Sequence, residues 1–404
     1  MIDPDVFDLD FEGHLKRVAE LTDDVLIPAE AEMVETGAVP EHVMEALARG
    51  GLFGISIPRA LGGLQWNMTQ QVRMTMEFTR ASCVYRSRFA SVIGLCSQAI
   101  LDHGTEEQCK RMLPGMAAGE LITAFALTEP GAGSDAGSLT TTARRGKDGG
   151  WVIDGHKRYI TNAHWADELV VFARTGSSRE GAGGVSAFLV PRRSRGLETR
   201  PATRMNGHAE APVAEITFTS VEVDDSALLG DRLGGGFPAA LRGINHARLH
   251  VAATCVGQAT RILEETAEHL LGRDQFGAPL ADLGAVQADL GECFAELEAA
   301  RALTVAAAED FDTGSIPRHR IAAAKLFSTE MASRVADRCV QLLGGEGIVG
   351  DHPVPRMWRD VRALRIYEGS SPIHERNLGR AVVRQVRSDG TLPDTYRVTG
   401  RQTV

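Results

Sequence analysis

The sequence contains no run of about 18 consecutive apolar residues, the length from which a membrane-spanning helix is built. The first residues, Met-Ile-Asp-Pro-Asp, are acidic. They show neither the apolar centre of a secretory signal nor the Arg- and Ser-rich character of a transit segment. These absences argue against a membrane protein, and we expect a cytoplasmic location.

Cysteines are few and scattered. None of the six forms a Cys-x-x-Cys pair, and they fall in apolar or helix-like stretches: Cys83, Cys96, Cys109, Cys255, Cys293 and Cys339. This pattern favours buried, reduced thiols over disulfides or a zinc site. A catalytic cysteine is not expected either.

Positive charge is also in short supply. The chain has 43 Lys and Arg against 53 Asp and Glu, which gives a net charge of −10, and only five of the cations are lysines. Phosphate contacts need clustered cations, and no basic stripe with interleaved aromatic residues is present. A general nucleic-acid binder is therefore not expected.

What the chain does have is length, since 404 residues suffice for two or three domains with proper cores. The first 120 residues carry apolar side chains at the three-and-four spacing of helices. Three helices are expected there, over 11–31, 41–48 and 69–103. Gly104 is expected to end the last of them, and Thr105-Glu-Glu-Gln108 to form a capping box that starts another.

The pattern changes near residue 121, where short apolar or alternating runs stand between Gly, Asp and Ser turns. Strands are expected in the runs that begin at Trp151, Leu169, Val185 and Ala214. From Gly236 the helical period returns in stretches far longer than the usual helix. These stretches are 237–271, 283–311 and 317–343. Long helices with short connectors are typical of a bundle.

The predicted fold class is therefore mainly α with a central antiparallel β domain. We divide the chain into an N-terminal helical domain (1–120), a small β-barrel-like middle domain (121–232) and a C-terminal four-helix bundle (233–404). No internal repeat or low-complexity tract is visible.

The stretch FALTEPGAGSDAGSLTTTA, residues 125–143, contains Gly131-x-Gly133-x-x-Ala136, the start of a dinucleotide-binding fingerprint. A Rossmann loop must leave a strand and open directly into a helix. The upstream residues 121–127 suit a strand, but the downstream threonines favour another strand over a helix. An NAD site is therefore not expected. The residues alone leave open a loop that binds another ligand and a β-turn that binds none.

Five separated strings resemble the acyl-CoA dehydrogenase family, in that family's order and spacing. They are LTEPGAGSD (127–135), YITNA (159–163), RDQFG (273–277), QLLGGEG (341–347) and RIYEGSSPI (365–373). The resemblance covers nearly the whole chain and agrees with the three-part organisation. It implies bound FAD, a homotetramer (a dimer is the alternative), and removal of two hydrogens from the α and β carbons of an acyl thioester. It also implies an electron-transfer flavoprotein as the electron acceptor.

The same resemblance implies which residues contact the cofactor. Thr128 would lie on the isoalloxazine ring, and Ser134 near both the pyrophosphate and the thioester arm. Tyr159 stands where the family usually has a tryptophan against the flavin, followed by Thr161. Arg273 and the segment from Gln341 would reach the FAD of a neighbouring subunit, although Gly344 and Gly345 also suit a helix cap. The remaining implied cofactor residues are Phe125, Leu127, Gly133, Phe276 and Ser370.

Glu368 matches the family's catalytic glutamate, which would take the α-proton while the β-hydrogen leaves as hydride to the flavin. Its backbone N–H would bind the thioester oxygen, with Gly369 letting the backbone pass close to the acyl chain. The alternative is a glutamate in a surface turn. Ala247 stands where some family branches carry the base, so no second carboxylate competes. Arg248 would hold the base ionised, or serve as a structural ion-pair partner.

Three other features leave alternatives open. Pro372 stands where the family often has a glutamine, which suggests altered flavin contacts or an unusual substrate. His246 and His250 have metal-ligand spacing but no third ligand nearby, so we expect them to flank the acyl site or face solvent, with no metal. Asp360 is expected to pair with a neighbouring arginine.

Three functions compete. The first is dehydrogenation of an acyl thioester, with chain length, branching and the carrier left open: coenzyme A, or an acyl-carrier protein in a biosynthetic pathway. The second keeps the fold but changes the chemistry, to that of a flavin monooxygenase or oxidase. The third is a non-catalytic binding protein, against which the retained Glu368 and flavin loops count.

Overall fold

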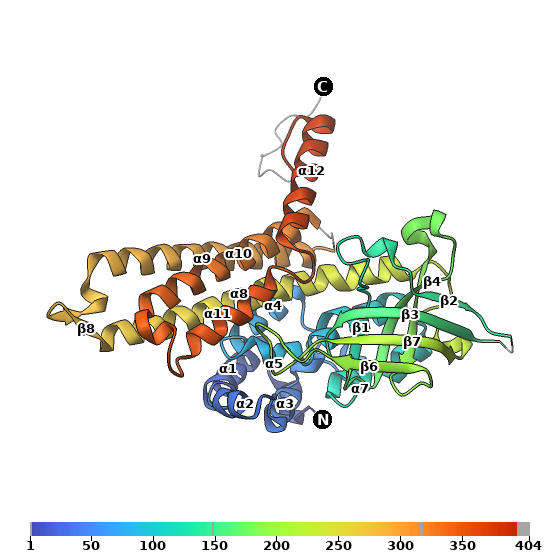
Figure 1. The fold of residues 1–404 in the computed structure, drawn as a ribbon, viewed down its shortest axis with the longest axis horizontal. Coiled ribbons are helices and arrows are strands. Elements are labelled where there is room, and N and C mark those ends of the chain that lie inside the picture. The colour runs from blue at the N-terminus through green and yellow to red at the C-terminus, as the bar shows by residue number, and fades with distance from the viewer. Residues whose placement is uncertain (1, 148, 315–317, 394–404) are drawn as a thin grey trace.

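A computed structural model describes residues 2–147, 149–314 and 318–393. The first part is helical and the middle part is a sheet, followed by a bundle of long helices (Figure 1). The predicted fold class is confirmed. The exact domain boundaries stay a prediction.

The N-terminal helices are α1 (Phe11–Leu21), α2 (Glu30–Thr36), α3 (Glu41–Arg49), α4 (Met68–Phe78), α5 (Cys83–Ser87), α6 (Cys96–His103) and α7 (Glu106–Ala118). Reciprocal capping boxes start α4, at Asn67 and Gln70, and α7, at Thr105 and Gln108. The capping box predicted at Thr105 is thus confirmed. Gly104 follows α6 as predicted, in extended conformation.

Two predicted helices are shorter than expected. The first is interrupted after α1 by a wide turn over Thr22–Leu26, two residues before Pro28, which cannot donate a helical hydrogen bond. The second, predicted over 69–103, stops after Phe78 and restarts at Cys83, with Ser82 as the N-cap residue. The side-chain amide of Gln258, on a later helix, donates hydrogen bonds to the carbonyl oxygens of Thr79 and Ala81, at 2.7 and 2.8 Å. A residue about 180 positions away in sequence thus stabilises the break.

The middle part contains β1 (Thr123–Ala126), β2 (Thr142–Arg145), β3 (Trp151–Ile160), β4 (Glu168–Arg174), β5 (Val185–Pro191), β6 (Leu197–Pro201) and β7 (Ala214–Val223). They form one sheet in the order β1-β4-β2-β3-β7-β6, with β5 also paired to β4. Most pairs are antiparallel as predicted, but β1 and β2 each run parallel to β4. The antiparallel prediction was wrong for these pairs. β1 and β4 are separated in sequence by other strands, so no hairpin joins them.

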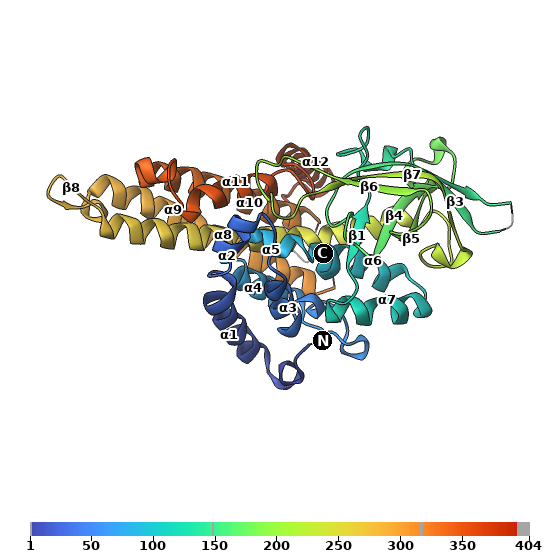
Figure 2. The same cartoon turned by 60° about the horizontal axis from the view of Figure 1, so that its bottom comes forward.

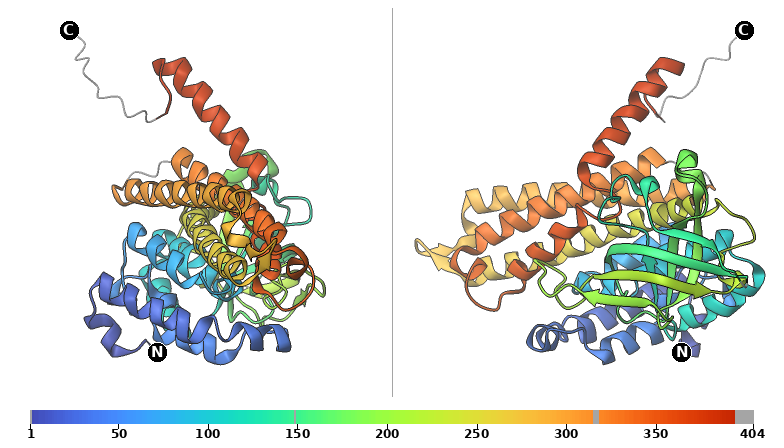
Figure 3. Two further views of the ribbon diagram at one scale, coloured as in Figure 1. Left: turned by 90° about the vertical axis from the view of Figure 1, so that its left-hand side faces the viewer. Right: turned by 45° about the vertical axis from the view of Figure 1, so that its right-hand side comes forward.

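The C-terminal part contains α8 (Gly236–Gly272), α9 (Gly284–Asp312), α10 (Arg318–Leu343), α11 (Pro353–Leu364) and α12 (Ser371–Asp389). A short hairpin, β8 (Asp274–Gln275) and β9 (Ala278–Pro279), joins α8 to α9. The three long helices match their predicted ranges within two residues, except that residue 317 lies outside the described residues. Helix α12 projects away from the others (Figure 3).

Helix α8 connects all three parts. It contacts α4 and α6 of the N-terminal part, β4 and β5 of the sheet, and α9 and α10 of the bundle (Figures 1 and 2). Close approach is possible because Gly257 has no side chain: a Cβ there would lie 2.4 Å from the carbonyl oxygen of Met76. Residues from every part can therefore meet along α8.

All six cysteines are free, and all except Cys109 are buried, as predicted. In the described part of the chain, no helix combines the length and apolarity needed to cross a membrane.

A buried ion pair holds the loop between β1 and β2. Glu129 lies 2.9 Å from the Nζ of Lys157, and both side chains are almost fully buried. The carboxylate also accepts hydrogen bonds from the backbone N–H groups of Thr140 and Thr141. Burial alone would raise the pKa of Glu129, but the ammonium and these donors outweigh it and lower the pKa to about 2. The pair thus pins the loop at both ends.

We expect Glu129→Gln to lower the free energy of unfolding by about 3–5 kcal/mol, because it leaves the Lys157 ammonium buried without a counter-charge. Glu20→Gln, which removes an exposed partner of Lys16, should change it by less than about 0.5 kcal/mol. Urea unfolding of the two variants measures both. Equal losses would mean that the buried pair does not hold the loop.

Candidate functional site

The turn between α11 and α12 carries Glu368, the predicted base. Glu368 and Gly369 both adopt left-handed backbone conformations, with φ of 56° and 98°. Arg248 of α8 donates from Nε to the Glu368 carbonyl oxygen at 2.9 Å, and Lys325 of α10 donates to that of Gly369 at 2.7 Å. His374 of α12 adds a longer contact to the Glu368 carbonyl, at 3.3 Å. Three helices therefore fix this turn.

The carboxylate of Glu368 itself makes no hydrogen bond or ion pair with the described residues. Glu330 nearby is different, because Arg365 and Ser371 both donate to it. Glu368 is also partly buried, so it is not the surface-turn glutamate of the alternative interpretation. Its carboxylate is free to accept a proton from a bound molecule.

Of the two roles that the sequence left open for Arg248, its charge agrees with the first, because it favours the ionised form of Glu368. Its Nε binds the Glu368 backbone carbonyl and its Nη1 binds the side chain of Asn245 at 2.8 Å, so no ion pair with the Glu368 carboxylate forms. Arg248 therefore affects the pKa of Glu368 by its charge, and it fixes the turn by its hydrogen bond to the backbone.

Burial raises the pKa of Glu368, while the charges of Arg248, Arg86 and Lys325 oppose that rise. Burial also lowers the pKa of Lys325 to about 8 and that of His374 to about 3. His374 is therefore neutral near pH 7, and Lys325 remains mostly charged. The site combines a carboxylate of raised pKa with cations that are held on the backbone carbonyls of the same turn.

The loop after β1 presents free backbone donors. Glu129 and Ala132 close a tight turn, after which the N–H groups of Gly133 and Ser134 have no hydrogen-bond partner in the described ranges. Both residues are exposed, and no atom lies within 4 Å of a Cβ placed on Gly133. As predicted, no α-helix follows, only the single 3-10 turn Ala136–Ser138. Free amides in an open loop suit an anionic ligand.

The neighbouring strand end brings two more predicted residues to this loop. The N–H of Arg158 donates to the carbonyl oxygen of Thr128 at 2.9 Å. Tyr159 follows with φ of 60° and a ring that is 61% exposed. After Thr161, Asn162 donates to the carbonyl oxygen of Arg88 at 2.8 Å, which fixes the strand end against the N-terminal part. An open loop and an exposed aromatic ring therefore lie side by side.

The other residues predicted near the cofactor lie beneath the loop or at the start of α12. Phe125 packs its ring on Phe172, with centroids 4.7 Å apart, and Leu127 is buried, so both form the base of the loop. Ser370 precedes α12, and its side chain makes no capping hydrogen bond. Pro372 lies in the first turn of α12, where its missing N–H costs nothing. The backbone thus accommodates Pro372, and its effect on flavin contacts or on the substrate stays a prediction.

Five predicted residues lie elsewhere, at the far end of the bundle. They come from the β8–β9 hairpin and the end of α10, opposite the sheet in Figure 1: Arg273, Phe276, Gln341, Gly344 and Gly345. Phe276 is 94% exposed. Gly344 ends α10 with φ of 60°, so it does serve as the predicted helix stop. One chain alone does not bring this group to Glu368.

The two histidines of α8 are buried, which corrects the idea that they face solvent. His250 is held by Thr75 and Gln71, whereas His246 Nδ1 has no partner within the described ranges. Burial lowers the pKa of His246 to about 3. The described residues hold no group of His, Cys, Asp and Glu arranged for a metal ion. Asp360 lies 3.7 Å from Arg356, as predicted.

Sequence reasoning missed Lys325 and His374. Lys325 had a signal, because it interrupts an apolar run, Ile-Ala-Ala-Ala-Lys-Leu-Phe, in a predicted bundle helix. A buried lysine needs an acceptor, and here the acceptor is the carbonyl of Gly369. His374 had no such signal.

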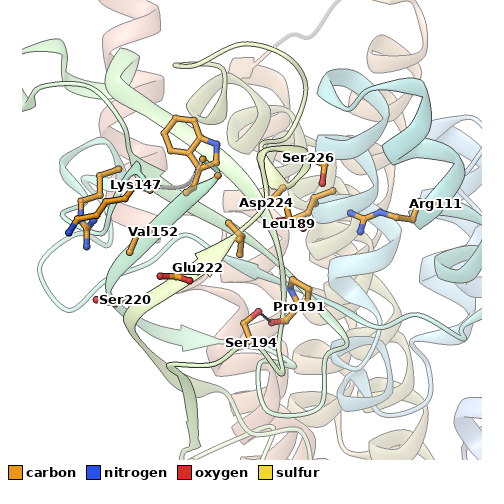
Figure 4. A pocket seen from close by; sticks show the side chains of 17 residues that line it. Arg111, Lys147, Val152, Leu189, Pro191, Ser194, Ser220, Glu222, Asp224 and Ser226 are labelled. Atoms are coloured by element: carbon orange, nitrogen blue, oxygen red, sulfur yellow. Dashed lines mark hydrogen bonds between the residues drawn. The ribbon is translucent and has the colours of Figure 1, made fainter.

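Two of the hollows between the described residues bear on the site. The larger, of about 730 Å³, lies on the sheet, mixes charges of both signs and contains none of the predicted site residues (Figure 4). The smaller, of about 480 Å³, lies beside the Arg248 side chain, because Asn245 lines it and binds that arginine. Phe237 and Leu241 give it apolar walls, and Arg318 adds a cation.

Models of three domains from one protein family match almost the whole chain. The acyl-CoA dehydrogenase N-terminal domain model matches residues 12–120, the middle domain model 124–221 and the C-terminal domain model 234–383. The chain is 34% identical over 356 residues to the caffeyl-CoA reductase-Etf complex subunit CarC of Acetobacterium woodii. That match covers 88% of this chain and 92% of the relative.

Solved structures agree. Butyryl-CoA dehydrogenase from Megasphaera elsdenii superposes with a TM-score of 0.88 and 29% identity, covering 93% of this chain and 98% of that one. A glutaryl-CoA dehydrogenase from Mycobacterium smegmatis in complex with FADH2 gives 0.85 and 26%, covering 97% and 98%. The fold similarity extends over the sheet and both helical parts.

We expect Gly369→Ala to lower the free energy of unfolding by at least about 1 kcal/mol, because φ of 98° strains any L side chain and the new Cβ would lie 2.8 Å from His374 Nε2. Gly379→Ala is the matched control, in an open position of α12, and should raise it by about 0.5–1 kcal/mol. Thermal unfolding compares the two. Equal effects would show that the turn tolerates movement.

Proposed function

Because this chain belongs to the acyl-CoA dehydrogenase family of FAD-dependent oxidoreductases acting on CH–CH bonds, we propose that it dehydrogenates an acyl thioester between its α and β carbons. The observation that carries the proposal is Glu368: an unpaired carboxylate of raised pKa on a turn held by Arg248 and Lys325.

The residues of the chain fit a flavin. The free amides of Gly133 and Ser134 suit its phosphates, and the exposed ring of Tyr159 offers a flat contact surface. We assign Thr128, Thr161 and Ser370 to the same cofactor, because they border this loop and the Glu368 turn. When bound, FAD accepts the β-hydrogen as hydride.

Glu368 takes the α-proton in this proposal. Its backbone N–H has no partner among the residues described, so it can donate to the thioester oxygen while the carboxylate of the same residue reaches the α-carbon. Gly369 would let the backbone pass close to the acyl chain, and a side chain at this position would collide with His374. Ser134 and Arg248 would border the thioester arm, which the hollow beside Asn245 leaves room for.

A relative of this chain is named a caffeyl-CoA reductase, which suggests that the reaction can also run in reverse. The same residues would serve in that direction. Glu368 would then return a proton to the α-carbon. An electron-transfer flavoprotein is the electron partner we propose, because the same relative is named as a subunit of a complex with one.

We further propose that the five residues at the far end of the bundle complete the cofactor site of another copy, in a homotetramer or dimer. Exposed apolar side chains gather at that end, on Leu271, Phe276, Ile348 and Val349. An exposed apolar surface of this kind marks a contact with another molecule. Arg273 would bind the phosphates of the partner's FAD by its guanidinium.

The proposed reaction can be tested by adding a panel of acyl-CoAs anaerobically to the FAD-loaded protein and following flavin absorbance. The wild type should lose its flavin absorbance with at least one of them. Glu368→Gln should slow that loss by about 10²- to 10⁴-fold, because the proton acceptor is gone. Glu375→Gln, an exposed carboxylate on α12, should leave the rate unchanged.

The pH dependence of the reaction rate provides a second test in the same experiment. Only ionised Glu368 accepts a proton, so the wild-type rate should fall as pH drops through a pKa above the ordinary glutamate value. Equal rates for the wild type and Glu368→Gln would contradict the assigned base. Absence of reaction with every acyl-CoA would rule out coenzyme A as the carrier. Reaction with a carrier-protein thioester would then keep the proposed dehydrogenation, and oxygen chemistry in its place would overturn it.

The assembly is tested by light scattering together with FAD retention. The purified protein should have the mass of a tetramer or a dimer, and Arg273→Ala should release FAD more readily on dilution than the wild type. Arg195→Ala removes another exposed arginine and should retain FAD normally. A monomer that holds FAD tightly would overturn this part of the proposal.

A further inference from the structure

A seam of buried side chains joins α9 to α10, which lie side by side (Figure 1). Along each helix the seam residues are spaced by alternating steps of four and three, the spacing of a two-helix coiled coil. On α9 they are Cys293, Leu297, Ala300, Thr304 and Ala307, and on α10, read toward its start, they are Cys339, Val335, Ala332, Ser328 and Lys325. A cysteine therefore begins the seam on both helices.

Two ion pairs beside the seam set the register of the helices. Arg334 donates to Glu296 at 2.7 Å, and Arg338 donates to Glu292 at 2.6 Å. A step of four residues forward on α10 thus matches a step of four residues backward on α9, so the helices run in opposite directions. The second ion pair joins the residues that immediately precede the two cysteines.

The contact between Thr304 and Ser328 shows which seam residues oppose each other. Their hydroxyl oxygens lie 3.1 Å apart. Cys293 precedes Thr304 by eleven residues and Cys339 follows Ser328 by eleven, and eleven residues make about three helical turns. Each cysteine thus lies on the same face of its helix as the hydroxyl residue. Because the helices are antiparallel, the two cysteines face each other across the seam.

The two thiols are free and buried, and they form a hydrogen bond with each other. This hydrogen bond lowers the pKa of Cys293, an effect that burial opposes and the charge of Arg338 supports. The same hydrogen bond, together with burial, raises the pKa of Cys339. Cys293 is therefore the thiol that ionises first. Its neighbours Glu292 and Phe294 are exposed, so a small oxidant reaches it from the outer face of α9.

We propose that Cys293 and Cys339 are a redox-active pair, which a peroxide oxidises to a disulfide between α9 and α10. The Cys293 thiolate attacks one oxygen of hydrogen peroxide, which breaks the O–O bond, leaves a sulfenic acid on Cys293 and releases one water. The Cys339 thiol then attacks that sulfur, so the S–S bond forms and the hydroxyl group leaves as a second water. The two thiols lose two electrons and two protons, and the peroxide gains them.

The disulfide would join α9 to α10 close to Gln341, which we assign to the cofactor site of another copy. The inference itself does not depend on the proposed reaction. It depends on the register of the two helices, because a disulfide forms only where the two Cβ atoms come within about 4.5 Å of each other.

The test exposes the reduced, FAD-loaded wild type to hydrogen peroxide, blocks the remaining thiols with iodoacetamide, and digests the protein with trypsin in the absence of reductant. Cleavage after Lys and Arg places the two cysteines in separate peptides, 274–301 and 339–356, which contain no other cysteine. Mass spectrometry should find these peptides joined, with two hydrogens fewer than the separate peptides, in most of the protein. Dithiothreitol should separate them again.

Variants assign the two roles. Cys339→Ser should form no cross-link and should leave a sulfenic acid on Cys293 that dimedone labels, because no second thiol attacks it. Cys109→Ser is the matched control: it removes the cysteine that is not buried, whose Sγ contacts the carbonyl oxygen of Ile100 at 3.4 Å, and it should cross-link like the wild type.

The wild type alone is sufficient to overturn the inference, so the test does not depend on a variant that folds. Absence of the joined peptides, or their appearance only in urea, would mean that the native register does not bring the two thiols together. Oxidation of Cys109 alone would likewise overturn the inference, because exposure and not the facing thiol would then govern the reaction with peroxide. An unlabelled Cys293 in Cys339→Ser would overturn the assigned attack on the peroxide.

Discussion

Two backbone carbonyls, those of Glu368 and Gly369, are the constraint on which the proposed site depends. A catalytic carboxylate must be buried enough to be a useful base, yet a buried charge needs compensation. A direct ion pair would compensate it but would also lower its pKa and occupy its oxygens. Here Arg248 and Lys325 bind the adjacent carbonyls instead, at 2.9 and 2.7 Å. Their charges act on the carboxylate from a distance, which leaves its oxygens free.

This arrangement requires three helices of the C-terminal part to converge on one turn. Helix α8 supplies Arg248, α10 supplies Lys325 and α12 supplies His374. The flavin-binding loop depends on a second buried charge, the pair of Glu129 and Lys157. That pair fixes the loop ends so that its exposed middle can leave backbone N–H groups unpaired. In both places a buried cation holds backbone, and the groups proposed for ligand binding remain unpaired.

The sequence predicted what local patterns encode. The long helices of the bundle, the capping box at Thr105 and the strands of the sheet follow from spacing and turn residues, and Glu368 follows from its motif. The break after α4 could not be predicted, because Gln258 on a distant helix accounts for it. The parallel pairing of β1 with β4 has the same origin, since pairing between remote strands leaves no local signal.

The missed residues of the site share that long-range character. Lys325 and His374 lie on different helices, and only the folded chain shows that both contact backbone carbonyls of the Glu368 turn. Arg248 and Lys325 oppose the raised pKa of Glu368 by their charges, but neither binds its carboxylate directly. A base held in this way keeps a pKa above that of an ion-paired glutamate, and its oxygens remain free to accept the proton of a substrate.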